Sequence, residues 1–378
     1  TGYISAILDG TYVTEARTGA ASGAAFDILG KKECRKGAMI GTGGQAACQL
    51  EAMLTARKLE EVAVYSRNKE KREAFAAEMQ EELKEFGTRI YAADSADEAV
   101  EDADLLITVT GSSEPVFDGT KVKPGCTISC VGTYEPHKHE LDPAVLPRTA
   151  KIICDSKDAV MAESGDLLIP IREGIISESD VLGSLGDVIN GTVAGRENDD
   201  EIIVFENVGI AALDLVAAKV IYDKAVEKGI AAIREGAHIV TDTNMAYSGV
   251  SKKTLEGFGG EAHCFMADAD VAKEAKERGV TRAVVCMERA ALIKAPLIIA
   301  VGNAPTALLR LCQLMEEGKI DPRLIIGVPV GFVNVVESKE EVIASKAPCI
   351  VARGRKGGSN VAAAICNALL YQASGRVL

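Results

Sequence analysis

The sequence predicts an α/β protein with two domains, each built around a parallel sheet. Three observations support this: an apolar strand near residue 40 runs straight into a glycine-rich turn and a helix, strands alternate with helices in both halves, and the chain has 378 residues. Alternating strands and helices are typical of parallel sheets that helices cover on both faces. A chain of this length exceeds one ordinary domain of about 100–200 residues.

Composition limits the class of protein and its partners. Hydrophobic residues make up 47% and charged residues 26%, which is typical of a soluble globular enzyme. The formal net charge is −13 and no basic run offsets it, so we expect neither nucleic acid nor an anionic membrane as a partner. Ten cysteines without a paired spacing predict reduced thiols in a cytoplasmic protein. No apolar stretch reaches the ~20 residues of a membrane helix.

The first half opens its α/β pattern with a strand, a glycine turn, a helix and a second strand. We expect these over Lys36–Ile40, Gly41–Ala46, Ala47–Leu59 and Val62–Tyr65. The turn has the GxGxxA spacing of dinucleotide-binding proteins and lies between the strand and the helix that this motif requires. The sequence therefore predicts a Rossmann-type, doubly wound parallel sheet whose core spans about residues 34–190.

Positions within the turn have distinct physical roles in such a site. Gly41 permits a tight turn, Gly43 lets the backbone approach a pyrophosphate, and Ala46 keeps the helix close to the strand. The helix N-terminus offers free N–H groups to the anion. The candidate cofactor-binding residues are Gly41, Thr42, Gly43, Gly44, Gln45 and Ala46. The alternative is a glycine turn that binds no ligand.

The residues after the second strand indicate which nicotinamide cofactor binds. An acidic side chain there would bond the ribose hydroxyls, whereas this chain has Ser66 and Arg67. A hydroxyl and a guanidinium suit a 2′-phosphate, so the sequence predicts NADP(H) in preference to NAD(H). The alternative is that Arg67 is a solvated loop charge. A later loop of Thr110, Gly111 and Ser112 is expected over the nicotinamide end.

Strands and helices alternate through the rest of the chain. Further strands are expected over Gly2–Leu8, Arg89–Ala92, Ala103–Thr110, Thr127–Val131, Lys151–Asp155, His238–Thr243, Ala283–Met287, Leu297–Val301, Leu324–Val328 and Cys349–Ala352. Further helices are expected over Lys69–Phe86, Ala96–Val100, Leu213–Ala232, Val271–Arg278, Thr306–Glu317, Lys339–Ala347 and Asn360–Gln372. The later elements predict a second parallel α/β domain after the first.

Glycine and polar clusters follow three of the later strands, at Gly302–Thr306, Val330–Phe332 and Arg353–Ser359. Ligands of open parallel sheets bind beyond the carboxyl ends of the strands. Cationic side chains before a helix N-terminus suit carboxylate or phosphate groups. The candidate substrate-binding residues are Asn303, Thr306, Arg353, Arg355, Lys356 and Ser359. The alternative is a basic loop that is only solvated.

Several motifs occur together in the first half: Ala16–Ser22, the glycine turn, Thr108–Thr110, Glu140–Pro143, Glu163–Asp166, Gly183–Asp187 and Val204–Gly209. With these, residues 1 to about 228 resemble the ornithine cyclodeaminase/mu-crystallin family. The resemblance implies hydride transfer between a nicotinamide and the α-carbon of an amino acid or cyclic imine. It also implies that Arg17, with Thr18, binds the substrate carboxylate. The alternative is an Arg17 paired to an acidic neighbour.

The first half departs from this family at two places. Where ornithine-cyclising members carry an aspartate, this chain has Tyr134, so the resemblance favours an imine reductase or amino-acid dehydrogenase, with Tyr134 as the candidate proton donor. The family also takes a substrate-binding arginine and a catalytic lysine from a segment upstream of Thr1. We therefore expect the true start of the protein further upstream. Without that segment we expect an exposed apolar face and impaired homodimerisation.

A dense set of motifs marks the second half: Gly229–Gly236, Val240–Met245, Gly302–Ala307, Gly327–Val333, Glu337–Lys339 and Gly354–Ser359. With these, residues 229–378 resemble the precorrin-8X methylmutase (precorrin isomerase) family. The family moves a methyl group on a corrin precursor in cobalamin biosynthesis, and the carboxylates of that macrocycle would require cationic loops. Its proton-handling histidine belongs to an upstream His-Ala-Thr-type motif that none of the four histidines here matches, so His238 is interpreted as structural.

The sequence predicts no metal site. His137 and His139 have no acidic or cysteine partner at metal-ligand spacing and are expected in an exposed loop.

The sequence thus predicts a two-part enzyme, a reductase-like half over residues 1–228 fused to a methylmutase-like half over residues 229–378. The expected partners are small-molecule substrates and, if the fold is complete, further copies of the chain. Two alternatives remain open: a catalytically incomplete fusion that binds NADP(H) or another ligand, and two gene fragments joined without a selected function.

Overall fold

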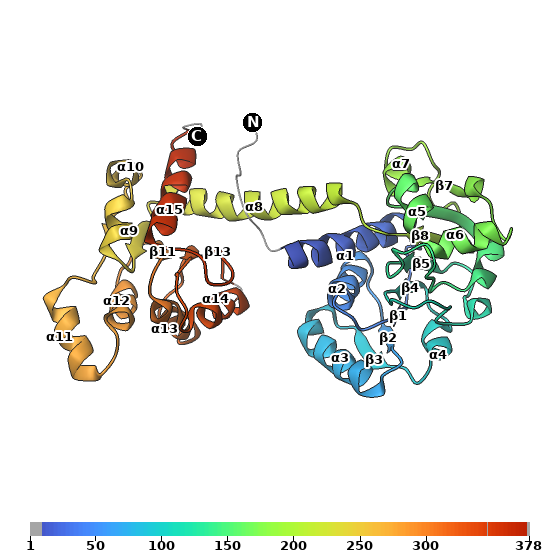
Figure 1. The fold of residues 1–378 in the computed structure, drawn as a ribbon, viewed down its shortest axis with the longest axis horizontal. Coiled ribbons are helices and arrows are strands. Elements are labelled where there is room, and N and C mark those ends of the chain that lie inside the picture. Colours follow the sequence, from blue (N-terminus) through green and yellow to red (C-terminus); the bar gives the residue numbers. More distant parts are fainter. Residues whose placement is uncertain (1–9, 346, 376–378) are drawn as a thin grey trace. The chain divides into compact units, whose positions relative to one another are not determined.

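The computed structural model describes residues 10–345 and 347–375 (Figure 1). The strand predicted over Gly2–Leu8 lies outside these residues. The chain divides into two compact units, Thr1–Ala218 and Lys219–Leu378. Across the described ranges, no helix combines the length and apolar character that crossing a bilayer requires.

The first unit is built on a parallel sheet, which has eight strands over the described residues 10–218. The strand order is β3-β2-β1-β4-β5-β8-β6-β7, and every pairing is parallel. The strands are β1 Lys36–Ile40, β2 Glu61–Tyr65, β3 Arg89–Ala92, β4 Leu105–Thr108, β5 Thr127–Cys130, β6 Thr149–Cys154, β7 Val181–Ser184 and β8 Ile202–Glu206. The order reverses between β1 and β4, so the predicted doubly wound topology is confirmed and its switch point lies between these strands.

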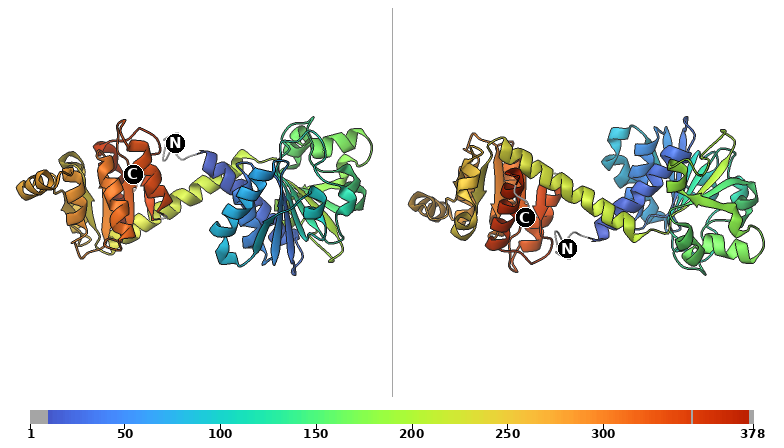
Figure 2. Two further views of the ribbon diagram at one scale, coloured as in Figure 1. Left: turned by 90° about the horizontal axis from the view of Figure 1, so that it is seen from below. Right: turned by 90° about the horizontal axis from the view of Figure 1, so that it is seen from above.

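Helices cover both faces of this sheet (Figure 2). Adjacent residues of β1 point into different cores. Met39 belongs to the same apolar cluster as Leu50 of α2, whereas Ile40 belongs to the cluster of Ala99 of α4. Such burial on both faces explains why the strands are apolar runs and do not alternate with polar residues. The helices are α1 Gly10–Leu29, α2 Ala46–Ala56, α3 Lys69–Glu82, α4 Ala96–Val100, α5 Lys157–Glu163, α6 Gly165–Arg172 and α7 Leu185–Ile189.

Helix α1 is an element that the sequence analysis did not predict. Its small residues let it lie close against α2: a Cβ on Gly19 would come within 2.5 Å of the Cys48 carbonyl oxygen, and one on Gly23 would meet Ala52 at 3.1 Å. Buried Asn207, just after β8, donates from Nδ2 to the Thr18 carbonyl at 3.3 Å. These contacts fix the helix that carries Arg17.

The second unit contains a smaller parallel sheet, with five strands over its described residues. Its order is β10-β9-β11-β12-β13, which confirms the predicted second parallel domain and places a switch point between β9 and β11. The strands are β9 His238–Thr241, β10 Ala262–His263, β11 Leu297–Val301, β12 Leu324–Gly327 and β13 Cys349–Val351. The helices are α9 Asn244–Gly249, α10 Lys252–Glu256, α11 Ala269–Arg278, α12 Arg282–Ala290, α13 Pro305–Glu316, α14 Val335–Ala344 and α15 Ser359–Ala373. Helix α8, Ala211–Arg234, contains the boundary between the units.

The strand predicted over Ala283–Met287 is wrong, because these residues lie in helix α12. Thr281 caps this helix by accepting from the Val284 N–H at 3.4 Å. The buried positions include Ala283, Cys286, Met287 and Ala290, which have helical spacing. A short apolar run does not distinguish a buried helix from a strand, and here the cap and the position of Ala290 decide.

Candidate functional site

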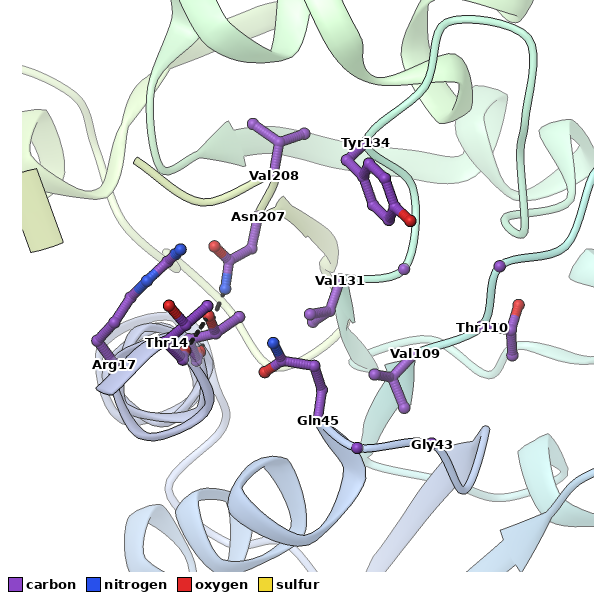
Figure 3. Close-up of a pocket in the computed structure, with 14 residues that line it drawn as sticks. Thr14, Arg17, Gly43, Gln45, Val109, Thr110, Val131, Tyr134, Asn207 and Val208 are labelled. Atoms are coloured by element: carbon purple, nitrogen blue, oxygen red, sulfur yellow. Dashed lines mark hydrogen bonds between the residues drawn. The ribbon is translucent and has the colours of Figure 1, made fainter. Parts of the chain in front are cut away.

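A cleft of about 350 Å³ lies at the carboxyl ends of the central strands of the first sheet. Figure 3 shows Arg17 on α1 at one side, Tyr134 and Thr110 at the other, and Gln45 of the glycine turn between them. The lining residues come from α1 and from the loops after β1, β4, β5 and β8: Thr14, Arg17, Thr18, Gly43, Gly44, Gln45, Val109, Thr110, Gly111, Val131, Gly132, Tyr134, Asn207 and Val208.

Most residues predicted for the first half meet in this cleft. Its lining includes the predicted residues Arg17, Thr18, Gly43, Gly44, Gln45, Thr110, Gly111 and Tyr134. Gly41, Thr42, Ala46, Ser66, Arg67 and Ser112 are not in the lining. Thr14, Asn207 and Val208 also line the cleft and were not predicted as site residues, although Asn207 and Val208 belong to the motif Val204–Gly209.

The glycine turn combines one crowded position with one open position. Gly41 has a φ of +119°, and a Cβ there would come within 2.3 Å of the Val109 carbonyl oxygen. A side chain is therefore excluded at Gly41 on both grounds. A Cβ on Gly43 would meet no atom within 4 Å. The turn thus leaves free space before the N-terminus of α2, where an anionic group is favoured.

Polar side chains gather where β2 ends. The Thr42 hydroxyl donates to the Ser66 hydroxyl at 3.2 Å, which links the glycine turn to the loop after β2. Arg67 follows and is exposed. This loop therefore presents the Ser66 hydroxyl and the Arg67 guanidinium beside the glycine turn, to which Thr42 adds a second hydroxyl.

Arg17 is held from one side of its guanidinium. Its Nε donates to Asp214 Oδ1 at 3.1 Å, and the same oxygen accepts from the Thr14 hydroxyl at 2.9 Å. Buried Nη1 has no hydrogen-bond partner among the described residues. Gly209 leaves room for this group, since a Cβ there would come within 2.4 Å of Nη1. Arg17 is thus paired to an acidic neighbour and still keeps donors for a ligand carboxylate.

Glu140 joins the two loops that form the far wall of the cleft. Its Oε2 accepts from the backbone N–H and the hydroxyl of Thr110, each at 2.7 Å, and its Oε1 accepts from the Gly132 N–H at 2.7 Å. The loops also touch directly, because a Cβ on Gly132 would come within 1.9 Å of the Thr110 carbonyl oxygen. One buried carboxyl group therefore sets the distance between these loops.

Two further buried carboxyl groups lie beside Glu140. Asp166 Oδ1 accepts from the N–H groups of Glu140 and Leu141 at 2.7 and 2.8 Å, and Glu206 Oε1 accepts from the Ser164 hydroxyl at 2.8 Å. Burial, reinforced by the charge of Asp166, raises the pKa of Glu140 to about 7. Burial also raises the pKa of Asp166, and burial together with Asp166 raises the pKa of Glu206 well above its usual value. The cluster therefore retains protons near neutral pH.

In the second unit, Asp242 organises the carboxyl edge of the sheet. Its carboxylate accepts from the N–H groups of Gly302, Asn303 and Ala304 at 2.9, 2.7 and 2.7 Å. The Thr243 hydroxyl donates to the Ser359 hydroxyl at 2.8 Å. The loops after β9 and β11 and the start of α15 are thus tied together.

Buried Lys339 of helix α14 holds the backbone of the predicted basic loop. This buried ammonium donates to the carbonyl oxygens of Gly354 and Lys356 at 2.7 and 2.9 Å. In the same loop, Arg353 forms a bidentate ion pair with Glu340 of α14 at 2.8 and 2.7 Å. The Arg355 guanidinium lies 5.6 Å from the centre of the Phe332 ring, which is 83% exposed.

The predicted residues of the second half differ in their contacts. Thr306 shares a hydroxyl hydrogen bond of 3.0 Å with Thr281, and Arg353 has its charge matched by Glu340. Arg355 and Lys356 are exposed, and Arg355 lies against the exposed ring of Phe332. This edge therefore presents cations and apolar surface together.

Comparisons with known proteins decide the family. The ornithine cyclodeaminase/mu-crystallin family matches residues 1–229, and precorrin-8X methylmutase matches residues 196–372. The chain belongs to both families. The resemblances found in the sequence are thereby confirmed, and the two matches overlap over residues 196–229, which include most of helix α8.

Individual relatives agree with this assignment. A Δ1-pyrroline-2-carboxylate reductase of Bacillus cereus (strain ZK / E33L) is 42% identical over 230 residues, 61% of this chain and 70% of the relative. A cobalt-precorrin-8 methylmutase of Priestia megaterium is 42% identical over 167 residues, 44% of this chain and 74% of the relative. The solved Thermococcus litoralis Δ1-pyrroline-2-carboxylate reductase, in complex with NADH and L-proline, is 40% identical with a TM-score of 0.56, covering 58% of this chain and 67% of that one.

We predict that the buried carboxyl cluster makes the first unit less stable as pH rises. The folded state keeps protons that the unfolded chain loses near pH 4–5, so the free energy of unfolding falls between that range and about pH 7. A retained proton corresponds to roughly 1.4 kcal/mol per pH unit. Glu206→Gln replaces one acid by a neutral side chain of similar shape and should flatten this slope in urea unfolding. The exposed control Glu163→Gln should not; equal slopes in the two variants would contradict the account.

Proposed function

We propose that the first half, residues 1–228, is a nicotinamide-dependent reductase of cyclic imino acids, with Δ1-pyrroline-2-carboxylate as the model substrate. One observation carries the proposal: Arg17, with a free buried donor, lines the same cleft as the open glycine turn. The similarity to Δ1-pyrroline-2-carboxylate reductases supports it.

The cleft fits a nicotinamide dinucleotide. Gly43 leaves open space before α2, and the buried Gln45 Oε1 at the same turn has no partner among the described residues. The turn Gly41–Ala46 would hold the pyrophosphate, and the loop of Thr110, Gly111 and Ser112 would lie at the nicotinamide end. When bound, the cofactor supplies hydride to the imine carbon.

The chain's own side chains would orient the substrate and handle the proton. Arg17 would bind the substrate carboxylate through its terminal nitrogens while Asp214 holds Nε, so the fork is fixed before the substrate arrives. Thr18 lies one residue farther along α1 and lines the same cleft. Tyr134, on the loop after β5, would donate the proton that the substrate nitrogen takes up.

The cofactor proposed is NADP(H) in preference to NAD(H). Ser66 and Arg67 follow β2, and the Ser66 hydroxyl is already bonded to Thr42 of the turn. These groups suit a 2′-phosphate. In this respect the proposal differs from the Thermococcus relative, whose structure contains NADH.

Nucleotide titrations test this preference. We expect the wild-type chain to bind NADPH roughly ten-fold or more tightly than NADH, since a hydrogen bond to a charged group contributes about 1.5–3 kcal/mol. Arg67→Ala should remove most of the difference by weakening NADPH binding alone. The exposed lysine Lys69 on α3 provides the control Lys69→Ala. Equal affinities of the wild type for the two nucleotides would contradict the preference.

Steady-state kinetics test the role of Arg17. With Δ1-pyrroline-2-carboxylate and NADPH, Arg17→Gln should raise KM roughly 10–100-fold, because a charged hydrogen bond to the carboxylate is lost. The affinity for NADPH should be unchanged. Arg172→Gln, an exposed site on α6, is the matched control. An unchanged KM in Arg17→Gln would contradict the role, and an inactive wild type that still binds NADPH would favour the catalytically incomplete alternative.

For the second half, residues 229–378, we propose binding of a corrin precursor and methyl migration on it. The observation in favour is the edge that presents Arg355 against the exposed ring of Phe332, with exposed Lys356 next in the chain, since a corrin precursor combines apolar faces with peripheral carboxylates. Asn303, Thr306, Arg353 and Ser359 complete the proposed site. The similarity to cobalt-precorrin-8 methylmutases supports it.

Binding of cobyrinic acid, a corrin with several carboxylates, tests this half through the corrin absorbance. Arg355→Gln and Lys356→Gln should each weaken binding roughly two- to five-fold, as expected for exposed ion pairs. Lys294→Gln, an exposed lysine elsewhere in the unit, should have no effect. Affinity that is unchanged in both loop variants would contradict the site.

We further propose a cytoplasmic protein that, if its fold is complete, forms homo-oligomers. All ten cysteines, each of them among the described residues, are free thiols, which fits a reducing compartment.

A further inference from the structure

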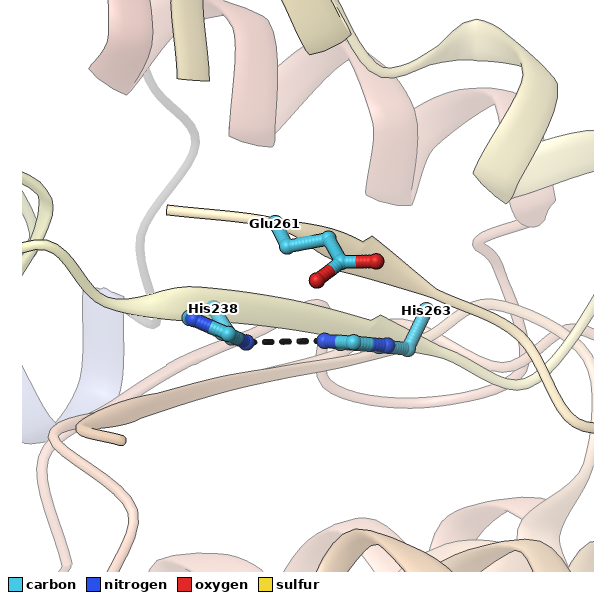
Figure 4. A group of neighbouring side chains, drawn as sticks. All are labelled: His238, Glu261 and His263. Atoms are coloured by element: carbon cyan, nitrogen blue, oxygen red, sulfur yellow. Dashed lines mark hydrogen bonds between the residues drawn. The ribbon is translucent and has the colours of Figure 1, made fainter. Parts of the chain in front are cut away.

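Three metal-ligand side chains lie together on one face of the second sheet, at its β10 edge. In the parallel pairing of β9 and β10, Ile239 aligns with Ala262 and Val240 with His263, so His238 aligns with Glu261. Side chains alternate between the two faces of a sheet, so His238, Glu261 and His263 all project from the same face. Figure 4 shows the two imidazole rings edge to edge with the Glu261 carboxylate beside them.

The ligand atoms of these residues are already close. His238 Nδ1 and His263 Nε2 lie 2.8 Å apart, and one ligand atom from each of the three side chains falls within 4.8 Å of the others. The His263 ring also stacks on Phe265, with centroids 5.9 Å apart, which limits the orientations that it can adopt. The rings are half-buried, and Glu261 is exposed.

From this geometry we propose that His238, Glu261 and His263 bind a divalent transition-metal ion of the Zn²⁺ class. Two imidazoles and a carboxylate form a ligand set that Zn²⁺ accepts, with a fourth position left for water or a ligand. Tetrahedral Zn–N bonds place two ligand nitrogens about 3.3 Å apart. The observed separation is 2.8 Å, the length of a hydrogen bond, so metal binding would replace the shared proton and turn both rings toward the ion.

This site is separate from the two proposed functions. His238 is the first residue of β9, whereas Asp242, which organises the proposed corrin site, follows the last residue of that strand. The reductase cleft is in the other unit. The inference also differs from the sequence analysis, which interpreted His238 as structural and predicted no metal site. The ligands are 23 and 2 residues apart in the chain, a spacing that becomes a cluster only through strand pairing.

Metal titrations of the whole, chelator-treated chain test the proposal. Zn²⁺ binding is measured by competition with a chromophoric chelator, and Co²⁺ binding by its visible absorbance. We expect a site whose affinity falls at least about ten-fold in His238→Ala and in Glu261→Gln, since each removes a direct ligand. Glu261 is exposed, so Glu261→Gln tests the site without threatening the core. Co²⁺ should show ligand-field bands without a thiolate charge-transfer band.

Two controls separate this cluster from other ligands. His137→Ala changes an exposed histidine of the first unit, and Cys264→Ser changes the thiol next to His263. Both variants should bind the metal as the wild type does. Wild-type affinity in His238→Ala and Glu261→Gln, or loss of binding in Cys264→Ser, would overturn the proposal. Neither readout depends on NADPH or a corrin, so failure here is distinguishable from failure of the proposed functions.

Discussion

The cleft of the first unit depends on the buried carboxyl of Glu140. It accepts three hydrogen bonds from Thr110 and Gly132, which belong to loops after two neighbouring strands. Asp166 in turn holds the backbone of Glu140. A charged carboxylate in such surroundings is costly, and burial with the nearby Asp166 raises the pKa of Glu140, although the donors of Thr110 and Gly132 oppose the shift. The protein therefore maintains the wall of its cleft with a group that is hard to ionise, and this links the shape of the site to proton uptake.

In the second unit, too, a buried carboxyl group accepts hydrogen bonds from a loop at the carboxyl edge of the sheet, here at the switch point between β9 and β11. Asp242 follows β9 and accepts three N–H groups from the loop after β11. Burial raises the pKa of Asp242, although those three donors oppose the shift. In both units an acid near the carboxyl edge of a parallel sheet collects the N–H groups of a neighbouring loop, because such loops contain donors that no strand satisfies. The loops that would bind ligands are thereby positioned before any ligand arrives.

The elements that depend on local pattern could be predicted from the sequence, whereas long-range pairings could not. The glycine turn, the strands of the first sheet and most helices follow from apolar runs and turn residues. The Arg17–Asp214 pair joins residues 197 positions apart, and the sequence left open whether an acidic partner existed. Helix α1 was not predicted, because several of its buried residues are small or polar, such as Thr18, Gly19 and Ser22, and no apolar stripe marks the face that packs on α2. The apolar run in α12 was assigned as a strand because periodicity alone does not separate the two in short segments.

The central claim is that the cleft between Arg17 and the glycine turn binds a nicotinamide dinucleotide. A crystal structure of the whole chain with NADPH tests it most directly. The account predicts the pyrophosphate against Gly43 and the N-terminus of α2, the 2′-phosphate beside Ser66 and Arg67, and the nicotinamide between Arg17 and the Thr110 loop. A nucleotide ordered elsewhere on the protein, or an empty cleft at saturating NADPH, would contradict it.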